Sequence, residues 1–247
     1  MTIIAVGSVA GSPGATTVAI GLAAAWPDAT RDRIVVEADP DGGRLGAQLG
    51  IGVEPGLMAL ALAVRTGDLD GAELVRRGAA SVGDWLAIPA PPSSEQTHSA
   101  LVHAGSSLAN VMGHDPDGAV WIVDAGRLSA RSPALPFAKA ADHTLLVSDG
   151  SFALLQLLVH RVDALRSAGC APVVAVVEPV AWTADEIADF VGVDVVAILP
   201  RVSGRTGLGA MGATAWRPWW RRLEDAADYL ATSTDAGDIA APTEARR

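Results

Sequence analysis

Short runs of β-branched and other apolar residues alternate with stretches of helical character along most of this chain. The strand-like runs cover residues 3–8, 33–38, 85–89, 119–124, 142–148, 171–177 and 193–199. The helical stretches cover residues 16–26, 56–65, 72–78, 94–112, 152–168, 183–191 and 217–231. Strands that are separated by helices at this spacing pair in parallel, because each connection is long enough to bring the chain back to the same edge. We therefore predict a doubly wound α/β fold, in which helices cover both faces of a mostly parallel sheet.

Length and composition agree with one large domain. The chain has 247 residues, of which 50% are hydrophobic and only 4% are aromatic. Such a chain buries a sizeable core, and small apolar residues suit helices that pack closely on a sheet. We find no internal repeat and no interdomain linker, so residues 1–231 are assigned to the domain. Residues 232–247 are small and polar, and they are predicted to form a disordered tail.

The charge and the cysteine content exclude several classes of protein. The formal net charge is −10, which opposes the positive field that a nucleic-acid-binding surface needs. Cys170 is the single cysteine, so neither an internal disulfide nor a cysteine metal cluster can form, and we expect a small buried side chain there. No apolar run reaches the length of a membrane span, and the N-terminus lacks the basic stretch of a signal peptide. We expect a cytoplasmic protein.

A glycine-rich turn directly follows the first predicted strand. Residues 10–17 read Ala-Gly-Ser-Pro-Gly-Ala-Thr-Thr. A turn of this kind between a strand and a helix directs backbone N–H groups and the positive end of the helix toward one point, which suits a phosphate group. Thr16 and Thr17 add hydroxyl groups that can contact Mg²⁺ or, in the alternative interpretation, only cap the helix. The residues alone leave both interpretations open.

Two acidic residues stand at the ends of predicted strands. Asp39 follows the second strand, and Asp124 ends the apolar run 119–124. In a doubly wound sheet these ends lie beside the first turn, where carboxylates can hold Mg²⁺ and water next to a nucleoside triphosphate. The alternatives are that residues 39–43 form only a turn and that Asp124 is satisfied by a local hydrogen bond.

Together these features resemble the ParA/MinD group of P-loop proteins over residues 3–230. That group has the loop Lys-Gly-Gly-x-Gly-Lys-Thr-Thr, a strand ending in Asp-x-Asp-Pro and a Walker B strand ending in Asp. Asp39-Pro40 is similar to the second motif, Asp124 to the third, and residues 196–201 to the last strand near the base. The resemblance implies ATP or ADP with Mg²⁺ as the ligand, or none if the site is lost. It assigns nucleotide contacts to Gly11, Gly14, Ala15, Thr16, Thr17, Pro200 and Arg201. It assigns metal contacts to Thr16, Asp39 and Asp124, of which the two acids are also the candidates for a catalytic role.

The departures from the family pattern concern its positive charges above all. Ala10 and Ala15 occupy the two lysine positions of the loop, and Lys139 is the only lysine in the chain. The loop lysine normally places its charge on the β- and γ-phosphates. Loss of such a transition-state contact lowers rates by roughly 10²–10³. Efficient ATP hydrolysis is therefore not expected, although Arg201 or Arg205 could supply a charge.

Three other departures affect the loop and the second motif. Ser12 replaces a glycine, Pro13 removes a backbone donor, and Glu37 stands at the first acidic position of Asp-x-Asp.

We expect the chain to act as a scaffold, localisation or regulatory factor in cell division, partition, or pilus or secretion assembly. The alternative is a genuine Mg-ATP-dependent switch with a remodelled phosphate loop. A DNA-binding partition ATPase is a third interpretation, which the acidic charge disfavours.

The helix predicted over residues 217–231 follows a stretch rich in tryptophan and arginine, Trp-Arg-Pro-Trp-Trp-Arg-Arg-Leu at residues 216–223. One interpretation packs its apolar side on the sheet, and another makes it a docking surface for a protein partner. A homodimer fits the resemblance. Membrane contact ranks below a protein partner because Glu224, Asp225 and Asp228 would repel anionic lipid. The five histidines show no metal-ligand spacing and are interpreted as ordinary residues: His98, His103, His114, His143 and His160.

Overall fold

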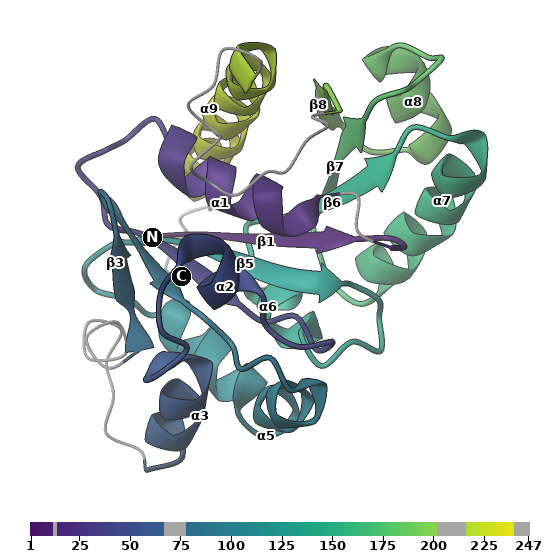
Figure 1. Ribbon diagram of the computed structural model, residues 1–247. Helices are drawn as coiled ribbons and strands as arrows, with labels where there is room; N and C mark the ends of the chain where they lie inside the picture. The colour runs from purple at the N-terminus through teal and green to yellow at the C-terminus, as the bar shows by residue number, and fades with distance from the viewer. Residues whose placement is uncertain (12–13, 67–77, 202–215, 240–247) are drawn as a thin grey trace, which may run out of the picture.

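The strands of the chain form one sheet, shown edge-on among its helices in Figure 1. The computed structural model describes residues 1–11, 14–66, 78–201 and 216–239. Within them the sheet has eight strands in the order β3-β4-β2-β5-β1-β6-β7-β8. Their bounds are β1 Thr2–Ser8, β2 Arg33–Glu37, β3 Ala80–Val82, β4 Trp85–Ile88, β5 Val120–Arg127, β6 His143–Asp149, β7 Pro172–Val177 and β8 Val195–Leu199. Every neighbouring pair is parallel except β3 and β4, so the predicted mostly parallel sheet is confirmed.

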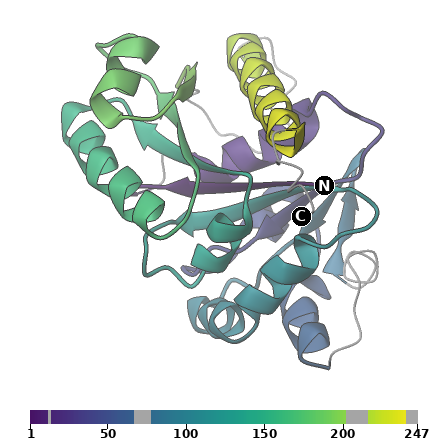
Figure 2. The ribbon, with the colours of Figure 1, turned by 180° about the vertical axis from the view of Figure 1, so that it is seen from behind.

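Helices cover both faces of this sheet, as predicted (Figures 1 and 2). One face carries α3 Gly56–Thr66, α5 Ser94–Met112, α6 Leu135–Ala140, α7 Phe152–Ser167 and α8 Ala184–Val191. The other face carries α1 Ala15–Ala25, α2 Leu45–Leu49 and α9 Arg217–Ile239. Sequence analysis missed α2 and α6, because helices of five and six residues are too short to show a periodic pattern. It also missed the three-residue edge strand β3. The helix predicted over 72–78 falls almost entirely outside the described residues.

The central strands are buried on both faces, which explains why they are apolar almost throughout. Trp121 in β5 is fully buried beneath the helices of the first face. Its indole Nε1 donates to the Asp115 carboxylate at 3.1 Å, so the large side chain is anchored at its polar end. Cys170 is buried, as expected for a small apolar side chain. Among the described residues, no helix is long and apolar enough to cross a membrane.

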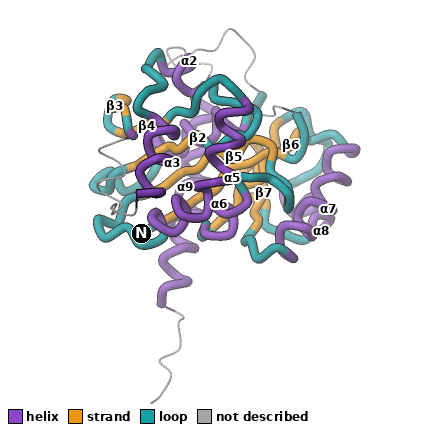
Figure 3. The backbone as a smooth tube through the Cα atoms, turned by 90° about the horizontal axis from the view of Figure 1, so that it is seen from below, coloured by secondary structure: helices purple, strands orange, loops and turns teal. Residues whose placement is uncertain are grey.

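The last helix lies across α1 with its tryptophan-rich side facing inward. Trp219 and Leu223 are buried against the second face, together with Trp216 just before the helix. They reach α1 where Gly21 leaves room, because a Cβ atom at this position would overlap Leu223 and Trp219. The tryptophan side of α9 therefore packs on the domain, as the first of the two sequence interpretations predicted. Figure 3 shows the far end of α9 extending beyond the sheet.

The helix α9 also runs further than the predicted end at residue 231. It continues to Ile239, where the sequence had indicated a disordered tail from residue 232. The hydroxyl groups of Thr232, Ser233 and Thr234 donate to backbone carbonyls four residues earlier, and Thr234 is buried. Polar side chains that satisfy themselves inside a helix do not end it, which is why composition misplaced the boundary. Residues 240–247 lie outside the described part of the chain.

The close approach of α9 to α1 makes Gly21 sensitive to substitution. We expect Gly21→Ala to lower the free energy of unfolding by about 1–3 kcal/mol, since the added methyl group overlaps two buried side chains. Gly105→Ala in α5 is the matched control, because its Cβ would meet no atom closer than 3.4 Å and alanine favours helices. Urea denaturation measures the free energy of unfolding of both variants. Equal stabilities for the two variants would contradict the described packing of α9.

Candidate functional site

Three parallel strands end side by side at the carboxyl edge of the sheet. Asp124 in β5 is in register with Val6 of β1 on one side and with Glu37 of β2 on the other. The chain leaves β1 through the glycine-rich turn and enters α1 at Ala15. The turn predicted to bind phosphate and the predicted acidic strand ends therefore lie together, at the edge where doubly wound sheets bind ligands.

The first helix begins without a capping side chain. Gly14 is its N-cap residue, with φ 102° in the left-handed region that favours glycine, and no side chain accepts a hydrogen bond at this cap. The interpretation of Thr16 and Thr17 as caps of α1 is therefore not supported. The positive end of the helix is left open toward the adjacent cavity. Ser12 and Pro13 lie outside the described residues.

A cavity of about 280 Å³ opens in front of this helix end. We call it the loop cavity, and its walls come from the glycine-rich turn, the ends of β1, β2 and β5, and α2. It is lined by Ser8, Gly11, Gly14, Ala15, Thr16, Thr17, Asp39, Asp41, Arg44, Gln48, Gly126 and Arg127. Five of the residues assigned to nucleotide contacts and two of the three assigned to the metal thus share one cavity. Sequence analysis had not singled out Arg44 or Arg127, because nothing in their spacing links them to the turn.

Asp124 lies behind the cavity wall that Thr16 and Gly126 form. Its carboxylate is buried, Oδ1 accepts from the Gly126 N–H at 3.2 Å, and Oδ2 has no hydrogen-bond partner within the described residues. Burial raises the pKa of Asp124 to about 7, although the Thr16 hydroxyl and the Gly126 N–H act in the opposite direction. A buried carboxylate with a free oxygen is costly unless a partner is supplied from outside. The local hydrogen bond that sequence analysis offered as an alternative satisfies only one of the two oxygens.

Asp39 reaches the same corner from β2. It is half-buried, and burial raises the pKa of its carboxyl above the ordinary value. Oδ1 accepts from the Asp41 N–H at 3.0 Å, so part of its role is the turn that sequence analysis had offered as an alternative. A side chain at Gly126 would overlap the Asp39 carboxylate, and Gly126 has φ 58°. This glycine allows both acids to approach the turn, and the family motifs gave no signal for it.

Glu37 has a structural role. Its Oε1 accepts from the backbone N–H groups of Arg44 and Leu45 at 2.6 and 2.8 Å, and its Oε2 accepts from Ala90 at 2.9 Å. These bonds fix the segment after β2 and join it to the end of β4. Burial nevertheless raises the pKa of Glu37 above its usual value. Since both oxygens are occupied, the acidic group at this position organises the walls of the cavity and is not a free ligand.

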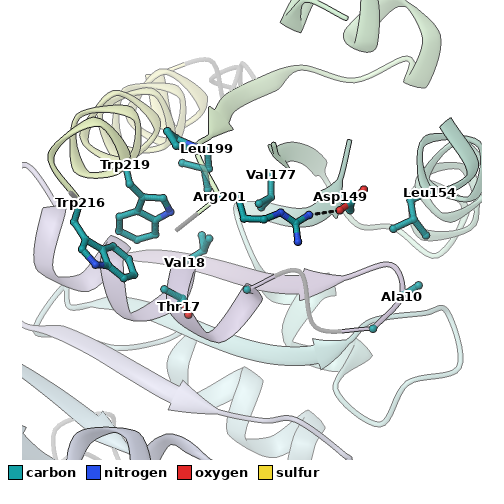
Figure 4. Close-up of a pocket in the computed structure, with 13 residues that line it drawn as sticks. Ala10, Thr17, Val18, Asp149, Leu154, Val177, Leu199, Arg201, Trp216 and Trp219 are labelled. Atoms are coloured by element: carbon teal, nitrogen blue, oxygen red, sulfur yellow. Dashed lines mark hydrogen bonds and ion pairs between the residues drawn. The ribbon is translucent and has the colours of Figure 1, made fainter. Parts of the chain in front are cut away.

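A second cavity, of about 510 Å³, shares lining residues with the first. Figure 4 shows the residues that line it. We call it the tryptophan cavity, and it is lined by Ala10, Gly11, Gly14, Thr17, Val18, Asp149, Leu154, Val177, Leu199, Pro200, Arg201, Trp216 and Trp219. Pro200 and Arg201, assigned to the base side of the site, lie here. Arg201 forms an ion pair with Asp149 and donates to the Glu178 carbonyl at 2.7 Å. The two cavities share Gly11, Gly14 and Thr17, so they meet at the glycine-rich turn.

Lys139, the one lysine of the chain, does not replace the positive charges that the loop lacks. Ala15 lines the loop cavity and Ala10 lines the tryptophan cavity. Lys139 lies in α6, just before β6 begins. Its Cε is 4.0 Å from the point that a Cβ atom would occupy at Gly169, which lies just before β7. This is the amino edge of the sheet, away from the turn. Arg205, the other predicted substitute, lies outside the described residues.

The donor set at the loop cavity fits Mg²⁺. The Asp39 carboxylate and the Thr16 hydroxyl line the cavity, and the Asp124 carboxylate lies behind them with an Oδ2 that has no hydrogen-bond partner among the described residues. Among the described residues, no three His, Cys, Asp or Glu side chains gather into a closed metal cage. This arrangement suits Mg²⁺, which retains waters and binds through few carboxylates together with phosphate oxygens. Thr16, Asp39 and Asp124 would hold the ion, and the ion would neutralise phosphate charge.

The unsatisfied oxygen of Asp124 leads to a stability prediction. We expect Asp124→Asn to raise the free energy of unfolding of the ligand-free protein by about 1–3 kcal/mol, because it removes a buried charge whose Oδ2 has no hydrogen-bond partner among the described residues. Asp115→Asn is the matched control, since both Asp115 oxygens accept N–H groups and the amide would place a donor against them. Urea denaturation without metal or nucleotide should therefore move the two variants in opposite directions. Destabilisation of both would show that Asp124 is a structural residue.

Comparisons with solved structures agree with this geometry. No protein-family model and no curated protein sequence matches the chain. The cell division ATPase MinD of Pyrococcus furiosus matches with a TM-score of 0.73 and 18% identity over 94% of this chain and 98% of that one. The septum site-determining protein MinD of Pyrococcus horikoshii, complexed with Mg-ADP, gives 0.70 and 18% over 95% and 99%. A ParA family ATPase of Chlorobium tepidum gives 0.64 and 18% over 93% and 97%. The chain therefore has the P-loop fold of the MinD and ParA ATPases along nearly its whole length.

Proposed function

We propose that this protein is a MinD/ParA-like scaffold or localisation factor whose nucleotide site does not support efficient hydrolysis. The observation that carries the proposal is Ala15 in the wall of the loop cavity, where the family pattern has its lysine. The strand-end acids and the turn remain in place beside it. The protein would serve a positioning process such as cell division, partition, or pilus or secretion assembly, in which fold and partner binding matter more than turnover.

The missing charges bear directly on catalysis. Phosphoryl transfer depends on cations that stabilise the charge developing on the transferred group. Ala15 removes that contact, and Ala10 removes the lysine that in the family pattern helps to join two subunits across ATP. Loss of one such contact lowers a rate by roughly 10²–10³. Slow or absent turnover follows, whether or not Mg-ADP or Mg-ATP binds.

The surface for a protein partner is proposed on the outward side of α9. Trp216 and Trp219 are buried, so they are not available for docking. Arg217, Arg221 and Arg222 remain exposed on the same segment. Arginine is frequent at interface hot spots, so this exposed arginine cluster is the proposed contact with a protein partner. We place this interaction in the cytoplasm, with a homodimer as a further arrangement and membrane contact ranked below both.

A second candidate function is a Mg-ATP-dependent switch with a remodelled loop. The free Oδ2 of Asp124 favours it, because a metal-bound water is the kind of partner that this buried oxygen lacks. Neighbouring folds include a MinD solved with Mg-ADP, although that likeness extends only to the fold. The two candidates differ in whether ATP is consumed and in whether position in the cell follows the nucleotide.

Phosphate release from Mg-ATP separates them. We expect the wild-type protein to release phosphate no faster than Asp124→Ala, which defines the background of the preparation. In the native host, the wild-type protein and this variant should also show the same localisation. Release well above the variant, together with ATP-dependent dimerisation, would replace the scaffold with the switch.

Restoring the loop lysine tests the physical reason for low activity. We expect Ala15→Lys to tighten Mg-ATP binding by about tenfold to a hundredfold, since a charged hydrogen-bond donor would enter the loop cavity. Ala24→Lys adds the same charge at an exposed position of α1 and is the matched control. Equilibrium dialysis measures both affinities. Equal affinities would show that the missing lysine is not what weakens the site.

A further inference from the structure

Two arginines line the loop cavity, and neither belongs to the phosphate-loop motif. Arg44 is the residue before α2, and Arg127 is the last residue of β5. Arg44 therefore approaches the cavity from the segment after β2, and Arg127 approaches it from the end of β5. Both are exposed, so their guanidinium groups can move toward a ligand without disrupting the core.

Neither guanidinium group has a hydrogen bond or ion pair with the part of the chain that the structure describes. Other arginines at this edge are engaged. Arg161 donates to the carbonyls of Leu128 and Val9, and Arg201 is bound to Asp149. The guanidinium groups of Arg44 and Arg127 thus keep their hydrogen-bond donors unused among the described residues, although both lie near enough to Asp39 to oppose the rise that burial causes in the pKa of its carboxyl.

The surroundings of Arg127 concentrate positive charge. Arg161 lies close enough that Arg127 lowers its pKa, although burial is the larger cause. The bonds of Arg161 tie the start of the glycine-rich turn to the loop after β5, so Arg161 supports the same wall. The open N-terminus of α1 adds N–H groups with partial positive charge. An anion in the cavity would therefore meet positive charge from Arg44, from Arg127 and from the N-terminus of α1.

Acidic groups restrict which anion can enter. Asp39 and Asp41 line the same cavity, and Asp124 lies behind it with one carboxylate oxygen that has no hydrogen-bond partner in the described part of the chain. These carboxylates would repel a lone phosphate, but they would attract a phosphate group that carries a divalent cation. A metal-complexed polyphosphate therefore suits this wall, because the arginines attract its phosphate oxygens and the acids attract its metal ion.

We propose that Arg44 and Arg127 bind the di- or triphosphate group of a Mg-complexed nucleotide in the loop cavity, in place of the lysines that the turn lacks. The guanidinium group suits this role because its planar fork can donate two parallel hydrogen bonds to phosphate oxygens. The base and sugar would lie in the tryptophan cavity, which adjoins at Gly11 and Gly14. This inference rests on the proposed function for the identity of the site, but it concerns binding and not turnover.

Titration of the full chain with magnesium tripolyphosphate, followed by isothermal calorimetry, tests the assignment. We expect the wild-type protein to bind, and Arg44→Gln and Arg127→Gln each to weaken binding by about tenfold. The double variant should lose measurable binding. Arg131→Gln, an exposed arginine four positions beyond Arg127 and outside the cavity lining, should bind like the wild type. Thermal unfolding of each variant without ligand confirms that the fold is intact.

Two results would overturn the assignment: no binding by the wild type at millimolar tripolyphosphate, or equal binding by wild type, Arg44→Gln and Arg127→Gln. Arg127→Lys adds a further test, because it retains the charge but loses the fork and should recover only part of the affinity. Rapid phosphate release would refute the scaffold and leave the arginine assignment standing. Unchanged binding in the glutamine variants would refute the arginines and leave the scaffold standing.

Discussion

The buried carboxylate of Asp124, whose Oδ2 has no hydrogen-bond partner among the described residues, is the constraint around which the carboxyl edge of the sheet is arranged. Parallel pairing fixes it between β1 and β2, next to Val6 and Glu37, and the helices on both faces keep water away from it. The protein accepts a buried acid with a free oxygen at the point where the turn opens. Stability alone would favour an apolar residue at this central position, and that cost supports the proposal that Asp124 belongs to a ligand site.

The remaining parts of the edge support that arrangement without chemistry of their own. Gly14 allows the turn to enter α1 with its N–H groups exposed, and Gly126 leaves space for Asp39. Glu37 uses both carboxylate oxygens to hold the segment that carries Arg44. In our proposal the framework of a phosphate site is thus maintained, while the lysines of the family pattern are absent. The proposed site would separate binding from catalysis, because Arg44 and Arg127 would supply charge to a bound phosphate while the transition-state contact of the loop lysine is lost.

The sequence predicted the parts of this protein that depend on local pattern. Apolar runs revealed the strands, and the family spacing placed Asp124 and Thr16 at one edge. It did not reveal Arg44, Arg127 or the tryptophans as cavity residues, because these come together only through the strand order. Hydroxyl groups that bond within α9 concealed its true length. The sequence also did not show that Trp219 packs on α1, because this contact depends on the missing side chain of Gly21, which matters only in the packed structure.

Thermal unfolding with Mg²⁺ alone, Mg-ADP and Mg-ATP tests the central claim most directly, that a lysine-free site still binds nucleotide. A ligand at about 100 times its Kd that binds only the native state adds roughly 2.7 kcal/mol, which raises Tm by several degrees in a domain of this size. The account predicts a rise with both nucleotides, no rise with Mg²⁺ alone, and intact ATP recovered afterwards. No rise at millimolar nucleotide would contradict it and leave the carboxyl edge of the sheet as a remnant without a ligand.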